Sequence, residues 1–197
     1  MRCEFEGTEL VQQYFEKGKS IITVVGHFAN WEIGTISDGR VSDHEMYTIY
    51  KKQSNPHFDE FMKRTRARFG FKLLEMREVN DFYQNHSAQP SFTVFIADQT
   101  PANPQKSYWT TFLNQQTPVF WGPEILARRY DLPVFFGEID RIKRGQFKIT
   151  LTPLVEKPRE TSKGEITEIH TRFLENIIEK EPHKWLWSHK RWKHRPS

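Results

Sequence analysis

Short β-branched and aromatic runs alternate along this chain with longer segments of helical periodicity. That alternation is typical of a single α/β domain in which helices flank a central, mostly buried mixed sheet. Strands are predicted at residues 20–26, 46–50, 71–74, 91–97, 132–139 and 147–151. Helices are predicted at residues 8–17, from about residue 30, from about 58 to 70, at 123–130 and at 162–181.

The length of the chain limits its organisation. Its 197 residues fit one domain, residues 1–197, with a core that needs no disulfide or structural metal. The single cysteine, Cys3, is expected in a frayed end and excludes a disulfide framework within the chain. The longest apolar run, residues 21–25, is far shorter than the roughly 20 residues of a membrane-spanning helix. Residues 98–116, rich in Pro, Asn, Gln and Thr, are predicted to form a long loop, and loops of this length are usually functional or disordered.

Positive charge is concentrated at the C-terminal end. Residues 183–197 contain five Lys and Arg side chains and no acid, so the formal charge of +4 falls to −1 without them. Trp185, Trp187 and Trp192 lie among these cations, and tryptophan is enriched at membrane interfaces. The segment therefore predicts binding to phosphates or anionic lipid headgroups. The alternative is a solvated basic end whose tryptophans pack against the core.

Several common site motifs are missing from the sequence. The run Gly18-Lys19-Ser20 resembles the end of a phosphate-binding loop, but Gln13 stands where that loop needs glycine, and a strand follows. No Gly-x-Ser-x-Gly sequence marks a serine hydrolase, and the histidines lack metal-binding spacings. We therefore expect no metal, no cofactor and no nucleic acid partner.

The segment GHFANWE, residues 26–32, lies where an apolar strand gives way to a helix. The ends of strands are where α/β folds place their chemistry. His27 on the turn and Glu32 in the first helical turn can meet, whereas residues five apart on one helix diverge by about 140°. A carboxylate bonded to one imidazole nitrogen leaves the other to take a proton from a hydroxyl. The motif predicts a general-base dyad; the alternative is a turn histidine before a glutamate that favours the helix dipole.

Five blocks of the chain, in order, resemble those of the bacterial lipid A late acyltransferases, the lauroyl and myristoyl acyltransferases. This family is a branch of the lysophospholipid acyltransferase superfamily. The blocks are GHFANWE at 26–32, the segment 50–70 with Asn55-Pro56 and Arg66-Ala67-Arg68, Ala97-Asp98-Gln99, GPEILAR at 122–128 and PHKWLWSHKRWK at 182–193. The resemblance extends across nearly the whole chain.

The resemblance implies a glycerolipid-acyltransferase-like fold and transfer of a fatty acyl group from a thioester to a hydroxyl. His27 would be the general base, oriented by Glu32. The donor would be acyl-acyl carrier protein or acyl-CoA, a co-substrate that needs no cofactor. The acceptor would be a lipid A precursor or related lipid at the cytoplasmic face of the bacterial inner membrane, an anionic surface that the chain would contact. Members usually carry an N-terminal membrane anchor, and only 26 residues precede His27, so the chain is expected to lack it.

The matched blocks also imply substrate-binding side chains. The expected set is Asn30, Lys51, Arg66, Arg68, Asp98 and Gln99. Arg66 and Arg68 diverge on a helix, so one can hold a phosphate while the other makes a structural pair. Asp98 can position the acceptor or act as a structural carboxylate. Lys51 replaces the usual arginine and loses its bidentate fork, which leaves the choice of acceptor open.

Aromatic side chains in the matched region have two possible roles. They line an acyl-chain groove or simply fill the core, which is the commoner role of buried aromatics. The residues concerned are Phe28, Trp31, Phe112, Phe120 and Trp121.

Three other functions fit the same residues. One is a glycerolipid or aminolipid acyltransferase, which shares the histidine-acid core. Another is a non-catalytic module that binds anionic lipid, although His27 and Glu32 argue against it. The third is a thioesterase, in which water replaces the acceptor hydroxyl.

Overall fold

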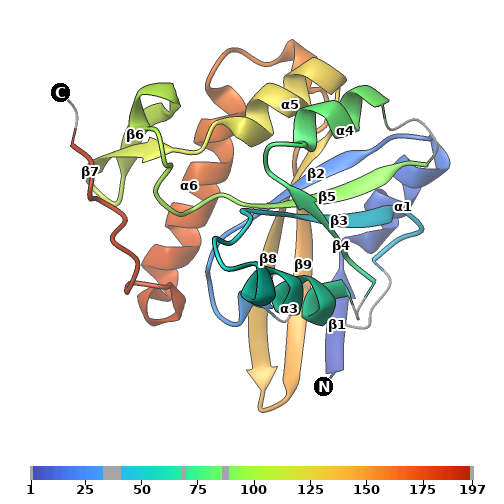
Figure 1. Cartoon of the computed structure of the whole chain (residues 1–197), viewed down its shortest axis with the longest axis horizontal. Coiled ribbons are helices and arrows are strands. Elements are labelled where there is room, and N and C mark those ends of the chain that lie inside the picture. The colour runs from blue at the N-terminus through green and yellow to red at the C-terminus, as the bar shows by residue number, and fades with distance from the viewer. Residues whose placement is uncertain (1, 33–40, 68–69, 86–88, 196–197) are drawn as a thin grey trace.

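The computed structural model describes residues 2–32, 41–67, 70–85 and 89–195, which form a seven-stranded mixed sheet with helices on both faces (Figure 1). The strand order is β1-β9-β8-β2-β5-β3-β4. The strands are β1 (Arg2–Glu6), β2 (Ile21–Val25), β3 (Glu45–Tyr50), β4 (Lys72–Glu75), β5 (Ser91–Ile96), β8 (Val134–Lys143) and β9 (Gln146–Val155). The predicted fold class, an α/β domain with a mixed central sheet, is confirmed.

Five neighbouring strands, from β8 to β4, run parallel, and β9 runs antiparallel to β8. Parallel strands covered on both faces are near-continuous apolar runs. The central strands β2 and β5 have this character, with the sequences IITVV and SFTVFI and almost complete burial. The runs that predicted these strands are therefore explained by their central position.

Helices cover the two faces of the sheet unequally. One face packs against α4 (Val79–Asn85), α5 (Gly122–Tyr130) and α6 (Glu165–Lys180), and the other packs against α1 (Thr8–Glu16). Alternate residues of β2 point to opposite faces. Ile22 and Val24 accordingly join the core under α5 and α6, whereas Ile21 packs with Val11 and Tyr14 of α1.

The segment predicted as one long loop contains regular structure. After a 3₁₀ turn, η1 (Pro104–Lys106), the chain forms an antiparallel hairpin of β6 (Tyr108–Phe112) and β7 (Gln115–Val119), which packs against α6. Leu113 and Asn114 connect the strands with φ angles of 47° and 61°. Positive φ at both central residues is the requirement of a type I′ hairpin turn. The loop prediction for residues 98–116 is therefore wrong over its second half.

Two other segments differ from the sequence expectations. Cys3 lies in β1, which pairs in parallel with β9, so the N-terminal end is not frayed there. The helix α4 was not predicted. The helix expected from about residue 30 begins at Trp31, and its continuation lies outside the described residues. The helix α3 (Pro56–Ala67) overlaps the helix expected from about 58 to 70 and begins two residues earlier, and residues 68–69 lie outside the described residues.

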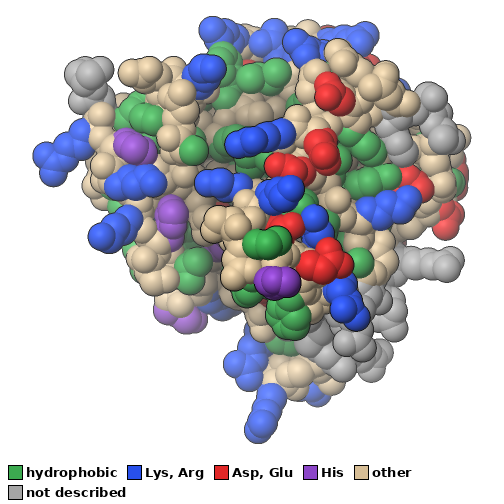
Figure 2. Space-filling view, in the orientation of Figure 1, with side chains coloured by type: hydrophobic (Ala, Val, Ile, Leu, Met, Phe, Trp, Pro, Cys, Tyr) green, Lys and Arg blue, Asp and Glu red, His purple; other side chains and the backbone are tan. Residues whose placement is uncertain are grey.

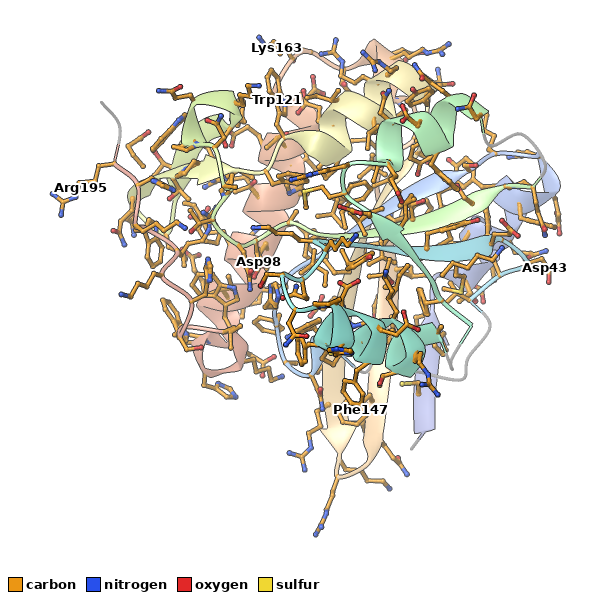
Figure 3. All side chains as sticks on the ribbon, viewed as in Figure 1. Asp43, Asp98, Trp121, Phe147, Lys163 and Arg195 are labelled. Atoms are coloured by element: carbon orange, nitrogen blue, oxygen red, sulfur yellow. The ribbon has the colours of Figure 1, made fainter. Side chains whose placement is uncertain are left out.

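The C-terminal segment after η3 (Pro182–Lys184) packs onto the domain. Trp185 and Arg191 are buried, and Trp192 packs against the core. Trp187 is exposed, and Arg195 projects outward at the edge of the molecule (Figure 3). The alternative of tryptophans packed on the core is thus confirmed for Trp185 and Trp192. None of the helices in the described part of the chain has the length and apolarity to cross a membrane.

Candidate active site

Two parallel strands bring a histidine and a carboxylate to one edge of the sheet. In the pairing of β2 with β5, Val25 lies opposite Ile96, and the Ala97 N–H donates to the Val25 carbonyl at 3.1 Å. Both strands end at this level, so His27 and Asp98 follow them side by side. Such an edge is where open α/β sheets bind their ligands.

The Asp98 carboxylate holds His27 through two hydrogen bonds. Its Oδ1 lies 2.6 Å from His27 Nδ1, and its Oδ2 accepts the His27 backbone N–H at 2.9 Å. The Asp98 side chain is 2% exposed and the His27 side chain 10%. Because an ionised carboxylate can only accept, Nδ1 carries a proton, and in the neutral imidazole Nε2 then has the lone pair. This geometry is that of a general base with an orienting acid.

The C-terminal segment forms another side of this site. The Trp185 Nε1–H donates to Asp98 Oδ2 at 2.9 Å, from inside the core. The Leu186 N–H donates to the His27 carbonyl at 3.1 Å, and Phe28 pairs with Trp185 in an isolated antiparallel bridge. The C-terminal segment, for which the sequence allowed either lipid binding or packing on the core, therefore holds both His27 and Asp98 in place.

The turn that contains His27 requires an unusual backbone conformation. A Cβ on Gly26 would lie 2.8 Å from Leu174 Cδ1, so glycine lets α6 approach the strand end. Ala29 has a φ of 51°, in the left-handed region that costs a residue with a Cβ about 1–2 kcal/mol. Its N–H donates to the Lys184 carbonyl at 2.8 Å, which helps to hold this conformation. Local strain of this kind is concentrated at functional sites.

The Nε2 side of His27 faces a cavity of about 770 Å³. Gln99 also lines the cavity, and its amide nitrogen lies 3.1 Å from His27 Nε2. Since Nε2 keeps its lone pair, the Gln99 amide donates to it. Trp31 packs edge-on against the imidazole with 4.6 Å between ring centroids, and it also lines the cavity. The volume falls within the range of about 300–1,000 Å³ typical of small-molecule sites.

Electrostatics keep Asp98 ionised. Burial alone would raise the pKa of Asp98, but the hydrogen bonds and charge of His27 and the Trp185 hydrogen bond together lower it. Arg191 adds a buried cation near this carboxylate and donates to the Pro118 carbonyl at 2.9 Å. Burial lowers the pKa of Arg191 to about 10 despite the attraction of Asp98, so the guanidinium remains charged near neutral pH. An ionised Asp98 can balance a positive imidazolium.

The carboxylate at Nδ1 of His27 is that of Asp98, rather than that of the predicted partner Glu32. Glu32 accepts a hydrogen bond from Arg66 Nη2 at 2.9 Å. Proximity in sequence favoured Glu32, whereas the pairing of β2 with β5 brings Asp98 across 71 residues of chain. Arg66 therefore makes the structural pair that was one of its two expected roles, and it also lines the cavity.

The other expected binding residues separate into three groups. Lys51 and Gln99 line the cavity with Arg66. Asn30 is exposed and is not among the described residues that line it. Arg68 lies outside the described residues.

The aromatic residues also divide between the two roles considered for them. Phe28 and Phe112 are buried in the core, where the Phe112 ring packs edge-on against Trp185. Trp31, Phe120 and Trp121 line the cavity and give part of its wall an apolar surface. Figure 3 shows Trp121 beside Lys163, whose ammonium lies 4.9 Å from the ring centroid.

The sequence profile of the bacterial lipid A biosynthesis acyltransferases matches residues 1–194 of the chain. The chain belongs to this family. It is therefore an acyltransferase enzyme of lipid A biosynthesis. A comparison with curated proteins gives no significant match.

Three residues at the site of this lipid A acyltransferase were not expected there. Trp185 was expected either at a membrane interface or packed on the core, and nothing in the local sequence indicates its contact with Asp98, 87 residues away. Lys106 and Lys193 line the cavity. Both were only weakly indicated by the sequence, since Lys106 lies in the long loop predicted to be functional or disordered and Lys193 lies in the basic C-terminal end.

We expect Trp185→Phe to lower kcat/KM of the lipid A acyltransferase about tenfold, because it keeps the aromatic packing but removes one hydrogen bond to a buried carboxylate. The matched control is Trp187→Phe, which removes an indole hydrogen bond to the Pro182 carbonyl on an exposed ring. Kinetics and thermal melting are measured on both variants. If Trp185→Phe melts early but turns over normally, the indole is purely structural.

Proposed function

We propose that the chain transfers a fatty acyl group from a thioester of acyl carrier protein or CoA to a hydroxyl of a lipid A precursor. His27 acts as the general base, and Asp98 orients it. The observation that carries the proposal is the buried His27–Asp98 pair, whose free Nε2 faces a cavity in a member of this family. The reaction takes place at the cytoplasmic face of the bacterial inner membrane.

In the proposed reaction the acceptor hydroxyl displaces the Gln99 amide from His27 Nε2. Nε2 takes the hydroxyl proton while the oxygen attacks the thioester carbonyl, so that a C–O bond forms and the carbonyl oxygen becomes an oxyanion. The C–S bond then breaks, and the departing thiolate takes the proton from the imidazolium. Asp98 stabilises the imidazolium between these steps, and no proton is left over.

The side chains that line the cavity are suited to bind groups of both substrates. Among the described residues, four cationic side chains line the cavity, and each suits a phosphate of the acceptor or of the pantetheine arm. These cations are Lys51, Arg66, Lys106 and Lys193. Apolar side chains lie between them, among them Ile49, Met62 and Phe120, and suit the start of an acyl chain.

The proposal is tested by supplying the purified chain with isotope-labelled acyl-acyl carrier protein or acyl-CoA, and with a phosphorylated lipid A precursor or a lysoglycerophospholipid. Mass spectrometry then identifies the product. The expected result is labelled lipid A precursor with one added ester. Release of free fatty acid with every acceptor would indicate a thioesterase, and labelling of the lysolipid alone would indicate a glycerolipid acyltransferase. Lipids from cells lacking and regaining the full-length gene identify the natural acceptor.

We expect Glu32→Gln to change kcat by less than about fivefold, because its pair with Arg66 is partly exposed and such pairs contribute about 0–1 kcal/mol. Asp98 continues to hold the imidazole in this variant. Steady-state kinetics with both substrates provide the measurement. A fall of a hundredfold or more in kcat, with a normal melting curve, would return the orienting role to Glu32.

A further inference from the structure

The helix α3 presents two aromatic side chains to solvent. Phe58 is 51% exposed and Phe61 is 61% exposed. Residues three apart on a helix are neighbours on its surface, so the two rings form one apolar patch. Single exposed hydrophobic residues are common, but adjoining ones mark surfaces that bind something.

This apolar patch continues around the mouth of the catalytic cavity. Phe58 lines the cavity, as do Met76 and Ile125, which are 42% and 46% exposed. Phe58, Phe61, Met76 and Ile125 are defined here as the mouth patch. Among the described residues, seven large hydrophobic side chains are strongly exposed, and these four are the majority. Apolar exposure is therefore concentrated where a substrate enters.

Positive charge accompanies the mouth patch. Lys51 and Lys52 are exposed just before α3, and Arg64 is exposed on the helix. Of the two acids of α3, Asp59 is buried and pairs with Lys63, which leaves Glu60 at the surface. The helix lies on the near side of the molecule, where Lys and Arg side chains lie beside hydrophobic ones, with Asp and Glu side chains among them (Figures 1 and 2). The charges of Lys51, Lys52 and Arg64 are complementary to anionic lipid headgroups.

We propose that the mouth patch inserts into the interface of an anionic bilayer and that Lys51, Lys52 and Arg64 bind its headgroups. This inference rests on the proposed function, in which the acceptor is a lipid. The acceptor headgroup then reaches His27 while its acyl chains stay in apolar surroundings. Helices with an apolar surface flanked by cations bind at interfaces in this way. The membrane-binding surface is thus assigned to α3 and not to the packed C-terminal segment.

A bilayer fits the mouth patch better than the acidic carrier protein does. Cations alone would serve a carrier, but two half-exposed phenylalanines beside the entrance also provide apolar area for acyl chains. Binding of the acyl carrier protein at the mouth patch is therefore the alternative that the experiment must distinguish.

The test measures binding of the whole chain to vesicles of phosphatidylcholine, with and without phosphatidylglycerol. We expect Phe58→Ser/Phe61→Ser to bind anionic vesicles about tenfold more weakly than the parent chain. The matched control is Ile142→Ser, since Ile142 is 49% exposed near the end of β8, away from the cavity lining. A second variant, Lys52→Glu/Arg64→Glu, should lose binding to anionic vesicles at low salt and bind neutral vesicles as before.

Melting curves confirm that each variant is folded, and the binding assay requires no turnover, so its result is independent of the proposed reaction. The proposal is overturned if both double variants bind like the parent chain, or if Ile142→Ser weakens binding equally. It is also overturned if vesicle binding is unchanged and the double variants raise KM for acyl-acyl carrier protein alone, which would make the mouth patch a carrier surface.

Discussion

Replacing His27 by alanine is expected to lower kcat by about 10²–10⁴-fold, the usual contribution of general acid–base catalysis. The reason is the position of Nε2, which faces the cavity while Nδ1 is held by Asp98. The adjacent Gln99 does not replace that lone pair, because its amide donates there and does not take the proton of a hydroxyl. Single-turnover transfer of labelled acyl groups measures the loss.

The matched control for His27→Ala is His44→Ala. His44 is also buried, but its Nε2 bonds to the Lys19 carbonyl, before β2 begins and therefore at the opposite end of that strand. This control should melt at a lower temperature and keep its turnover. If His27→Ala retains full turnover, the mechanism proposed for the site is wrong.

The strands and the edge that carries the chemistry could be predicted from sequence. The apolar runs of β2 and β5 are buried on both faces, so they give a strong signal, and His27 follows the first of them. What the runs cannot specify is which strands are neighbours. Asp98 was expected at the end of a buried strand, but its contact with His27 follows from the pairing of β2 with β5.

Local signals failed where the structure depends on distant parts of the chain. The strand β1 is five residues long and contains charged side chains, and its partner β9 begins at Gln146. The hairpin turn at Leu113 and Asn114 lacks the glycine that marks most tight turns, so its strands were taken for loop. The basic C-terminal segment has the composition of a membrane-binding end, yet Trp185 and Arg191 are buried beside Asp98.

The Asp98→Asn variant is expected to lose activity almost as completely as His27→Ala, although asparagine has nearly the same shape as aspartate. In the Ser-His-Asp triad the same change costs about 10⁴-fold, since the imidazole is left in the wrong tautomer. The folded variant is expected to lose about 1.5–3 kcal/mol of stability, because a charge-assisted hydrogen bond is removed. Glu124→Gln is the control, as Glu124 is a buried carboxylate that accepts from Gly164 and Thr167, away from the cavity lining.

The hydrogen bonds around residue 98 determine which tautomer His27 adopts in the Asp98→Asn variant. Oδ2 of Asp98 accepts two N–H groups, from the His27 backbone and the Trp185 indole, so the amide oxygen must take that place and the NH₂ must face His27 Nδ1. Nδ1 then has to accept, the ring proton moves to Nε2, and Nε2 can no longer take a proton from the acceptor. We expect turnover to fall by about 10²–10⁴-fold while KM for both substrates stays near the parent values. NMR of ¹⁵N-labelled histidine shows the tautomer directly. A variant that keeps Nδ1–H and normal turnover would show that Asp98 does not orient the base.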